Sequence, residues 1–499
     1  MKKKVMLNVG CTMLCQLMTF ISGLIVPRLI LSTFGSEANG LVSSIAQFLN
    51  YISLVEGGIG SVVLTALYGP LAKKDDRKIS SILKAAENFF RQIASIFVVY
   101  TIVLACVYPI VIKSSFSWLY VASLTVILSF TLFIQYFFSI TYKLLLQADQ
   151  KMYIVQLWHA LITLLNIIAV VASVKIFPEL HFVKLCSVML FVIQPMAYSN
   201  YVKKHYKLHK DVESDKDSLA QRWACFGQNF AYFIHSNTDV VVLTLFSDLK
   251  AVSVYSVYLL VVKNLQSFFK AFSNAFNPMI GKAIAVNDYK QANKYMKTYE
   301  FVVSNIATII FGCCIYLLPS FVLIYTHGVT DTNYYRVFFS TIIILAEYIY
   351  CIREPYESVV YAAGKFKETS NSAYIEAIIN IVLSVILVFK YGLEGIAVGT
   401  FIGMLYRMIY WIWFINKYIM PYPISNIVKR LSLSIGTIMI SCLIVSVLNT
   451  TGSLTLILWV KNGVLCFAVF CAVTVILNLA FDKESFLDVC KRIVSKRKG

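Results

Sequence analysis

The chain has 499 residues, of which 59% are hydrophobic and only 14% are charged. Soluble domains carry about 25% charged residues, so this composition excludes a large soluble core and indicates an integral membrane protein. The formal net charge of +19 does not indicate a nucleic-acid partner, because Lys and Arg gather in short connections between apolar runs. Attraction to anionic lipid and control of topology account for charge in such places. The 12 cysteines form no CxxC pair, so we expect no structural metal.

Apolar segments long enough to cross a bilayer, which takes a helix of about 20 residues, follow one another along the whole chain. We expect fourteen spans, at 7–32, 40–68, 85–112, 118–142, 152–174, 182–200, 223–246, 253–278, 298–326, 337–360, 369–389, 395–416, 431–449 and 457–481. The predicted fold class is therefore an all-α integral membrane protein with about 14 transmembrane helices. The first segment begins like a signal peptide, but it runs too long for one, so we interpret it as an uncleaved span.

Lys and Arg fall almost entirely in every second connection between these spans. Basic clusters stand at Lys2–Lys4, Lys73–Lys78, Lys203–Lys210 and Lys491–Lys498, whereas the alternate connections hold few basic residues. Because cytoplasmic loops carry the excess of Lys and Arg, this asymmetry predicts that both termini are cytoplasmic. We therefore expect a multi-pass membrane protein.

The first twelve spans divide into two halves that are weakly similar. Residues 147–151 precede the fifth span, which contains Asn166, and residues 361–365 precede the eleventh, which contains Asn380. Six spans per half give a parallel pseudo-twofold repeat, and transporters built this way place the substrate at the repeat interface. We expect an N-lobe at 1–200, a cytoplasmic linker at 201–221, a C-lobe at 222–418, two additional spans within 428–481 and a basic cytoplasmic tail at 482–499.

The eighth span carries the clearest polar stripe. Lys263, Gln266, Lys270 and Asn274 recur at three- and four-residue spacing, which places them on one face of a helix. Charged groups at this depth usually face a protein interior or a water-filled cavity. The stripe indicates either the lining of a hydrophilic cavity, where the cations favour an anionic substrate, or polar contacts between helices with lysines that reach the interface.

Other polar residues within the spans are candidates for binding, coupling or gating. Arg28 follows Pro27 near the outer end of the first span, and it either snorkels to the interface or pairs with Asp239, which lies at nearly the repeat-equivalent position. The second span contributes Gln47 and Asn50 as a milder polar face. The remaining candidates are Glu56, Arg353, Glu354, Glu376 and Arg407.

Roles for these candidates follow from their charge and position. Arg353 and Glu354 lie in the cytoplasmic half of the tenth span and Glu376 lies low in the eleventh, so we expect mutual pairing there as a structural clasp or an inner gate. Arg407 has no partner visible from sequence. Glu56, Asp239 and Glu376 could titrate or bind Na⁺, so H⁺ or Na⁺ coupling stays open, and each could instead pair with Lys or Arg. The chain lacks a phosphate-binding motif, so we expect no ATP hydrolysis. We also predict no cofactor and no catalytic residue.

Several segments, in this order, resemble the Wzx-type polysaccharide flippases for O-antigen and capsule repeat units, which belong to the multidrug/oligosaccharidyl-lipid/polysaccharide exporter superfamily. They are Pro27–Leu31 with Phe34–Gly35 and Gly40–Leu41, Glu56–Gly60, Leu146–Lys151 and Tyr391–Thr400. The resemblance implies two lobes that open to one side at a time, with spans one, two, seven and eight lining the cavity.

The resemblance also implies a substrate and partners. The substrate would be undecaprenyl-pyrophosphate carrying an oligosaccharide, moved from the inner to the outer leaflet of the bacterial cytoplasmic (inner) membrane. The partners would include polysaccharide polymerase and chain-length machinery. Carried over by position, Arg28, Lys263 and Lys270 are candidates for the pyrophosphate, with Arg407 as a weaker one. Lipid II flippases use two extra spans to extend a groove for the lipid tail. That role is not transferred here, because spans thirteen and fourteen show no clear polar face.

Two other functions remain open from the sequence. A cation-coupled multidrug exporter of the same superfamily would show an acid-lined cavity, whereas cations dominate here. A membrane enzyme of polysaccharide assembly, such as a polymerase or ligase, would show long outer loops, whereas these are short. The sequence does not distinguish O-antigen, lipopolysaccharide, capsule, exopolysaccharide and teichoic-acid substrates.

Overall fold

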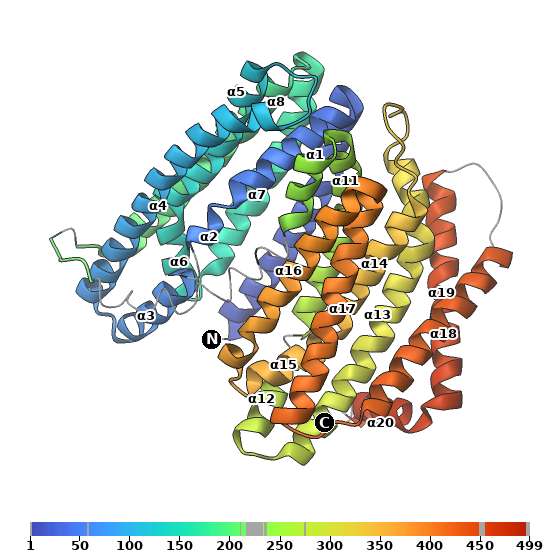
Figure 1. Cartoon of the computed structure of the whole chain (residues 1–499). Helices are drawn as coiled ribbons and strands as arrows, with labels where there is room; N and C mark the ends of the chain where they lie inside the picture. The colour runs from blue at the N-terminus through green and yellow to red at the C-terminus, as the bar shows by residue number, and fades with distance from the viewer. Residues whose placement is uncertain are drawn as a thin grey trace. The chain divides into compact units, whose positions relative to one another are not determined.

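The chain folds into α-helices that form two compact units. The computed structural model describes residues 2–56, 59–209, 211–215, 233, 237–273, 276–448 and 455–495, and these contain no β-strand. Figure 1 shows the helices with their labels. Unit 1 comprises Met1–Ser256 with Gly328–Thr332, and unit 2 comprises Val257–His327 with Asn333–Gly499. The division falls within one helix, α11, and the predicted lobe boundaries stay a prediction.

Within the described residues, unit 1 contains the nine helices α1–α9, a π-helix, one further helical segment and the start of α11. Its elements are α1 (Lys2–Asn50), α2 (Ser53–Glu56), α3 (Ile59–Lys73), α4 (Asp76–Val111), α5 (Trp118–Ile134), η1 (Gln135–Ser139), α6 (Ile140–Ala148), α7 (Met152–Ile176), α8 (Leu180–Phe191), α9 (Ile193–His205), a helical segment at Asn237–Phe246, and α11 (Leu249–Ser273).

Two glycines shape α1. Gly35 kinks it with a φ of 83°, which glycine adopts at little cost. Gly40 packs against the backbone of Leu249 and leaves no room for a Cβ.

Unit 2 continues from α11 to the C-terminal helix. Its elements are α12 (Asn277–Ala285), α13 (Tyr289–Tyr325), α14 (Val337–Ile352), α15 (Glu354–Ala362), α16 (Phe366–Tyr391), α17 (Leu393–Tyr418), α18 (Ile424–Leu448), α19 (Leu456–Phe481) and α20 (Lys483–Ser495). Helices α16 and α17 lie close together because glycines recur every four residues along α17. A Cβ at Gly395 or Gly399 would collide with Leu387 or Ser384 of α16, and small residues permit such close approach of membrane helices.

Ten helices within the described residues are long and apolar enough to cross a membrane. They correspond to predicted spans one, three to six, nine and eleven to fourteen, so a multi-pass integral membrane protein is confirmed, while fourteen spans stay a prediction. The second predicted span is divided among the end of α1, α2 and α3. The tenth is interrupted at Arg353, where α15 begins with Pro355 in its first turn. The seventh lies largely outside the described residues, and the polar stripe of α11 makes the eighth less apolar.

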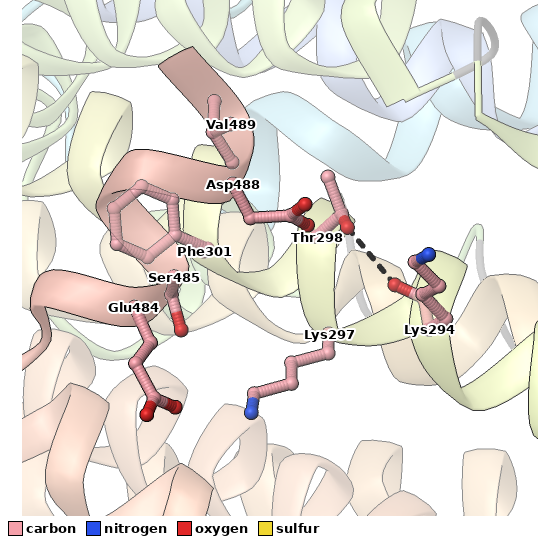
Figure 2. A pocket seen from close by; sticks show the side chains of 8 residues that line it. All are labelled: Lys294, Lys297, Thr298, Phe301, Glu484, Ser485, Asp488 and Val489. Carbon is pink, nitrogen blue, oxygen red and sulfur yellow. Dashed lines mark hydrogen bonds between the residues drawn. The ribbon is translucent and has the colours of Figure 1, made fainter. Parts of the chain in front are cut away.

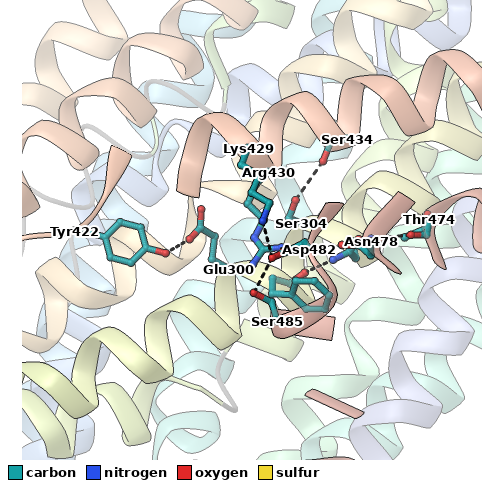
Figure 3. A network of polar contacts seen from close by, with 12 residues as sticks. Glu300, Ser304, Tyr422, Lys429, Arg430, Ser434, Thr474, Asn478, Asp482 and Ser485 are labelled. Carbon is teal, nitrogen blue, oxygen red and sulfur yellow. Dashed lines mark hydrogen bonds and ion pairs between the residues drawn. The ribbon is translucent and has the colours of Figure 1, made fainter. Parts of the chain in front are cut away.

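The last two spans carry polar faces, so the interpretation that they show none was wrong. In α18 the buried residues Arg430, Ser434, Thr437 and Ser441 recur at helical spacing. In α19 the buried residues Thr474 and Asn478, with Asp482 just after the last turn, do the same. These side chains face α13: Thr308 donates to Ser434 at 2.8 Å, and Asn478 donates to Asn305 at 2.7 Å. Figure 3 shows this network, in which Asp482 also accepts hydrogen bonds from Arg430 and Lys429. The stripes were missed because large apolar residues dominate both helices.

Candidate substrate-binding site

Lys263, a predicted site residue on α11, lies beside a buried carboxylate of another helix. Its Nζ lies 3.8 Å from Oε1 of Glu347, which projects from α14, and the Lys263 side chain is 39% exposed while that of Glu347 is 2% exposed. The neighbouring Gln266 is buried on the same helix. An ammonium held at this distance keeps part of its surface accessible. Lys263 can therefore bind a phosphate as a compact point charge, in competition with the Glu347 carboxylate.

For two further predicted residues of the polar stripe, the structure describes no side chain. The backbone of Lys270 belongs to α11, but its side chain lies outside the described part of the structure. Asn274 also lies outside the described residues. Their assignment to the substrate site therefore stays a prediction.

A buried ion cluster joins the break between α14 and α15 to α16 and α17 within unit 2. The Nη1 of Arg353 donates to Oε1 of Glu376 at 2.7 Å, and Nε of Arg407 lies 3.7 Å from Oε2 of the same carboxylate. All three side chains are at least 93% buried. Arg407 also donates to the hydroxyl of Ser372 and lies 4.4 Å from the ring centre of Trp411. The structure thus supplies the partner of Arg407 that the sequence did not reveal.

The predicted pairing of Arg353 with Glu376 is present, whereas the role of this pair as a clasp or a gate stays a prediction. One carboxylate between two guanidinium groups holds three helices together. Breaking such a buried pair leaves an uncompensated charge. Glu354 is half-buried at the start of α15, where a carboxylate interacts favourably with the helix dipole. In this conformation Arg407 is buried inside unit 2 and contacts protein groups, so it is a weaker candidate for the substrate than Lys263.

The candidates of unit 1 lie on α1, α2 and the helical segment Asn237–Phe246. Gln47 donates to the side-chain oxygen of Asn237, and the buried Asp239 accepts a hydrogen bond from the hydroxyl of Tyr255 at 2.6 Å. Asn50 is exposed, and Arg28 is half-buried on α1. Glu56 ends α2, and its side chain lies outside the described part of the structure. Gln47 and Asp239 thus make packing contacts, and their substrate and coupling roles stay predictions.

Sequence reasoning missed a buried acid of α13. Glu300 is 4% exposed and accepts hydrogen bonds from the hydroxyls of Tyr356, at 2.9 Å, and Tyr422. Burial and the Glu300 carboxylate together raise the pKa of the Tyr422 phenol above its usual range. Glu300 was not among the predicted candidates, although it stands near the start of the predicted span 298–326. The sequence indicates the burial of this acid only weakly, because the two tyrosines that contact Glu300 are distant in sequence and uncharged.

A cavity of about 270 Å³ lies between α13 and the amphipathic helix α20 (Figure 2). Lys294 and Lys297 line it together with Glu484 and Asp488. Because the lining carries both signs of charge, it favours no anion over a cation. Among the described residues, no group of three His, Cys, Asp or Glu side chains could hold a metal ion.

Comparison with known proteins identifies the fold. Residues 224–386 match the MatE family model. A search of curated protein sequences finds none that match. The chain is similar to the solved structure of a lipid II flippase, MurJ, in an inward closed conformation, with 18% identity, a TM-score of 0.70, and coverage of 94% of this chain and 98% of that one.

Multidrug transporter structures match over less of the chain. An inward-facing multidrug resistance MATE family transporter of the MOP superfamily is 13% identical, with a TM-score of 0.58, and covers 82% of this chain and 96% of its own. The Vibrio cholerae MATE transporter VcmN in its bent form is 12% identical, with a TM-score of 0.52, and covers 82% of this chain and 95% of its own. The chain is therefore a multi-pass membrane protein with the fold of the MOP superfamily. The solved structures that share this fold are those of a lipid flippase and of multidrug transporters.

Proposed function

We propose that this protein is a flippase that moves an undecaprenyl-pyrophosphate-linked oligosaccharide from the inner to the outer leaflet of the bacterial cytoplasmic membrane. The observation that carries the proposal is the extent of the structural likeness. The lipid II flippase structure covers 94% of this chain, whereas the two multidrug transporters cover 82% each. A fold shared over nearly the whole chain with a lipid flippase supports a lipid-linked substrate.

The charge at Lys263 supports an anionic substrate. The ammonium is partly exposed, whereas its partner Glu347 is buried, so the surface that an incoming group meets is cationic. A pyrophosphate carries several acceptor oxygens, and hydrogen bonds between charged partners are roughly twice as strong as neutral ones. In this proposal Lys263 and Lys270 bind the pyrophosphate, with Arg28 as a further contact, and hydroxyl and amide groups such as Asn50 bind the sugars.

Transport proceeds by alternating access in this account. The two lobes open a central cavity first to the cytoplasm and then to the outside, and both termini stay cytoplasmic, as the distribution of Lys and Arg favours. The undecaprenyl chain remains in the bilayer while the charged headgroup crosses through the protein. Coupling to H⁺ or Na⁺ would use an acid of the spans, such as Asp239 or Glu56. The substrate repeat unit belongs to O-antigen, capsule or a related polysaccharide.

A cation-coupled multidrug exporter is the second candidate function. The MatE model matches residues 224–386, and this match favours an exporter function for part of the C-terminal half. Organic cations are bound by carboxylates in a cavity. The candidate site instead presents the partly exposed ammonium of Lys263, which would repel them.

Reconstitution into vesicles tests the two functions side by side. The purified protein is placed in liposomes with a short undecaprenyl-pyrophosphate glycan, and flipping is followed by the access of a lectin to the sugar. Uptake of a fluorescent organic cation is measured in the same vesicles under H⁺ and Na⁺ gradients. We expect lectin access to rise faster than in protein-free vesicles, with no cation uptake. Gradient-driven cation uptake without glycan flipping would replace the flippase by the exporter.

A further inference from the structure

A polar cavity of about 360 Å³ lies within unit 1, among α1, the α5–η1–α6 segment, α7, α8 and α9. It is distinct from the candidate substrate site, because none of the residues that line it is a predicted substrate-binding residue. The polar side chains that matter here are Gln135, Ser139, Lys143, Gln156, His159 and Gln194. All of them come from apolar helices that are long enough to cross a membrane. Polar groups at such positions are costly unless they serve an interaction.

The local backbone turns one polar stripe toward this cavity. Gln135, Ser139 and Lys143 follow one another at four-residue spacing along η1 and α6. The first two belong to a single π-helical turn, Gln135–Ser139. Such turns insert an extra residue into a helix and occur frequently at functional sites. On α7, Gln156 and His159 are three residues apart and face the same cavity.

The cavity is lined by hydrogen-bond donors that surround one cation, the ammonium of Lys143. In the described part of the chain, no carboxylate lies within ion-pair distance of the Lys143 ammonium, and none of the residues that line the cavity is acidic. The side-chain amide nitrogen of Gln194 lies 3.1 Å from Nδ1 of His159. With this amide as the donor, the imidazole carries its proton on Nε2, which can donate to a ligand. The cavity therefore favours an anion.

The depth of the cavity matches the headgroup region of a bilayer. Lys143 stands five residues before Ala148, where α6 ends, which is about 8 Å along the helix axis. That end leads into the connection that the distribution of Lys and Arg assigns to the cytoplasm. Large apolar side chains at flanking positions are exposed on the surface: Phe138, Leu157 and Met196 are 52%, 43% and 61% exposed. Acyl chains can cover these side chains while a headgroup enters the cavity.

We propose that this cavity binds the phosphate group of a lipid in the cytoplasmic leaflet. Lys143 supplies the positive charge, and the His159 Nε2–H and the amides of Gln135 and Gln156 donate hydrogen bonds to the phosphate oxygens. The phosphate comes either from a resident anionic phospholipid or from the polyprenyl carrier itself. The inference does not rest on the proposed function, because binding at this cavity is measured without transport.

Binding to the purified full-length protein tests the proposal. A photo-crosslinkable phosphatidylglycerol is added to the protein in phosphatidylcholine nanodiscs, and labelled peptides that contain residues 131–160 are quantified by mass spectrometry. Lys143→Gln removes the cation, and Lys175→Gln, at the other end of α7, is the matched control because Lys175 is exposed. His159→Gln tests the second donor. A melting curve for each variant verifies that it is folded.

The proposal expects saturable labelling that falls about tenfold in Lys143→Gln and stays unchanged in Lys175→Gln, because one charge-assisted contact is lost. Competition with undecaprenyl phosphate and with unlabelled phosphatidylglycerol then distinguishes the two sources, since the preferred lipid displaces the label at lower concentration. Equal labelling of the folded Lys143→Gln variant and the wild type would overturn the proposal. Equal displacement by phosphatidylcholine would also overturn it.

Discussion

Arg353 donates a hydrogen bond to Glu376 across 2.7 Å, and both side chains are about 95% buried. The pair links the break between α14 and α15 to α16, and Arg407 of α17 joins it through the other carboxylate oxygen. In a low-dielectric interior, such a network is stable only while its charges compensate each other. The arrangement explains why charged residues are placed within otherwise apolar helices of unit 2.

Removing one member of this cluster should destabilise the protein strongly. We expect Glu376→Ala to lower the free energy of unfolding by about 3–5 kcal/mol, because two guanidinium groups would remain buried without their carboxylate. Thermal melting in detergent measures the change. Glu394→Ala is the matched control: Glu394 pairs with Arg336 at 3.5 Å, and both side chains are partly exposed, so its loss should cost at most about 1 kcal/mol. Similar losses for both variants would contradict the assignment.

Substitutions at Lys263 and Glu347 should act on the substrate in opposite directions. Lys263→Ala should abolish transport while membrane insertion stays intact, because the anion loses its nearest cation. Glu347→Gln removes a competitor that lies 3.8 Å from the Lys263 ammonium, so the variant should bind undecaprenyl pyrophosphate more tightly. Binding by fluorescence titration and flipping in vesicles give the two readouts. Lys390→Ala, an exposed lysine at the end of α16, should behave like the wild type in both.

The C-terminal helices should depend on a second buried ion pair. Asp482 accepts hydrogen bonds from Arg430 and, at 2.9 Å, from Lys429. Asp482→Ala should release the α18–α20 segment from α13 and expose its connections to limited proteolysis, because Arg430 would stay buried and unpaired. Lys429→Ala removes a side chain that is 44% exposed and should change little. A protease pattern for Asp482→Ala that matches the wild type would show that packing alone holds these helices.

Alkaline pH should weaken the end of α9 through Tyr206. Its hydroxyl donates to Asp149 at 2.6 Å, and burial together with this carboxylate raises the pKa of the phenol. A raised pKa in the folded state means that the stabilisation is complete below about pH 10, the usual value for tyrosine, and is lost as the pH rises above it. Melting temperatures measured across this range should fall more for the wild type than for Tyr206→Phe. Parallel curves would rule out this linkage.

Local patterns in the sequence predicted much of the fold and part of the site. The long apolar runs predicted membrane helices, and charge signs predicted the pairing of Arg353 with Glu376. The partner of Arg407 and the neutral partners of Glu300 were not evident, because they lie on other helices far along the chain. Ion pairs and hydrogen bonds between distant segments leave no periodic signal within either segment.

The polar cavity of unit 1 also could not be predicted from local sequence patterns alone. The spacing of Gln135, Ser139 and Lys143 was readable, but a π-turn is needed to align them with Gln156 and His159. The polar stripes of α18 and α19 were also readable, at Arg430 and Ser434 and at Asn478 and Asp482. They were overlooked because the apolar character of a span was taken as the evidence for its role.

The lipid content of cells that lack this gene tests the central claim most directly. Undecaprenyl-linked material is extracted from the deletion strain and weighed by mass spectrometry, with wild-type and Lys263→Ala copies returned to parallel cultures. The account predicts that undecaprenyl-pyrophosphate with a complete repeat unit accumulates in the inner leaflet, and that only the wild-type copy reverses it. Normal lipid content together with intact surface polysaccharide would contradict the flippase assignment.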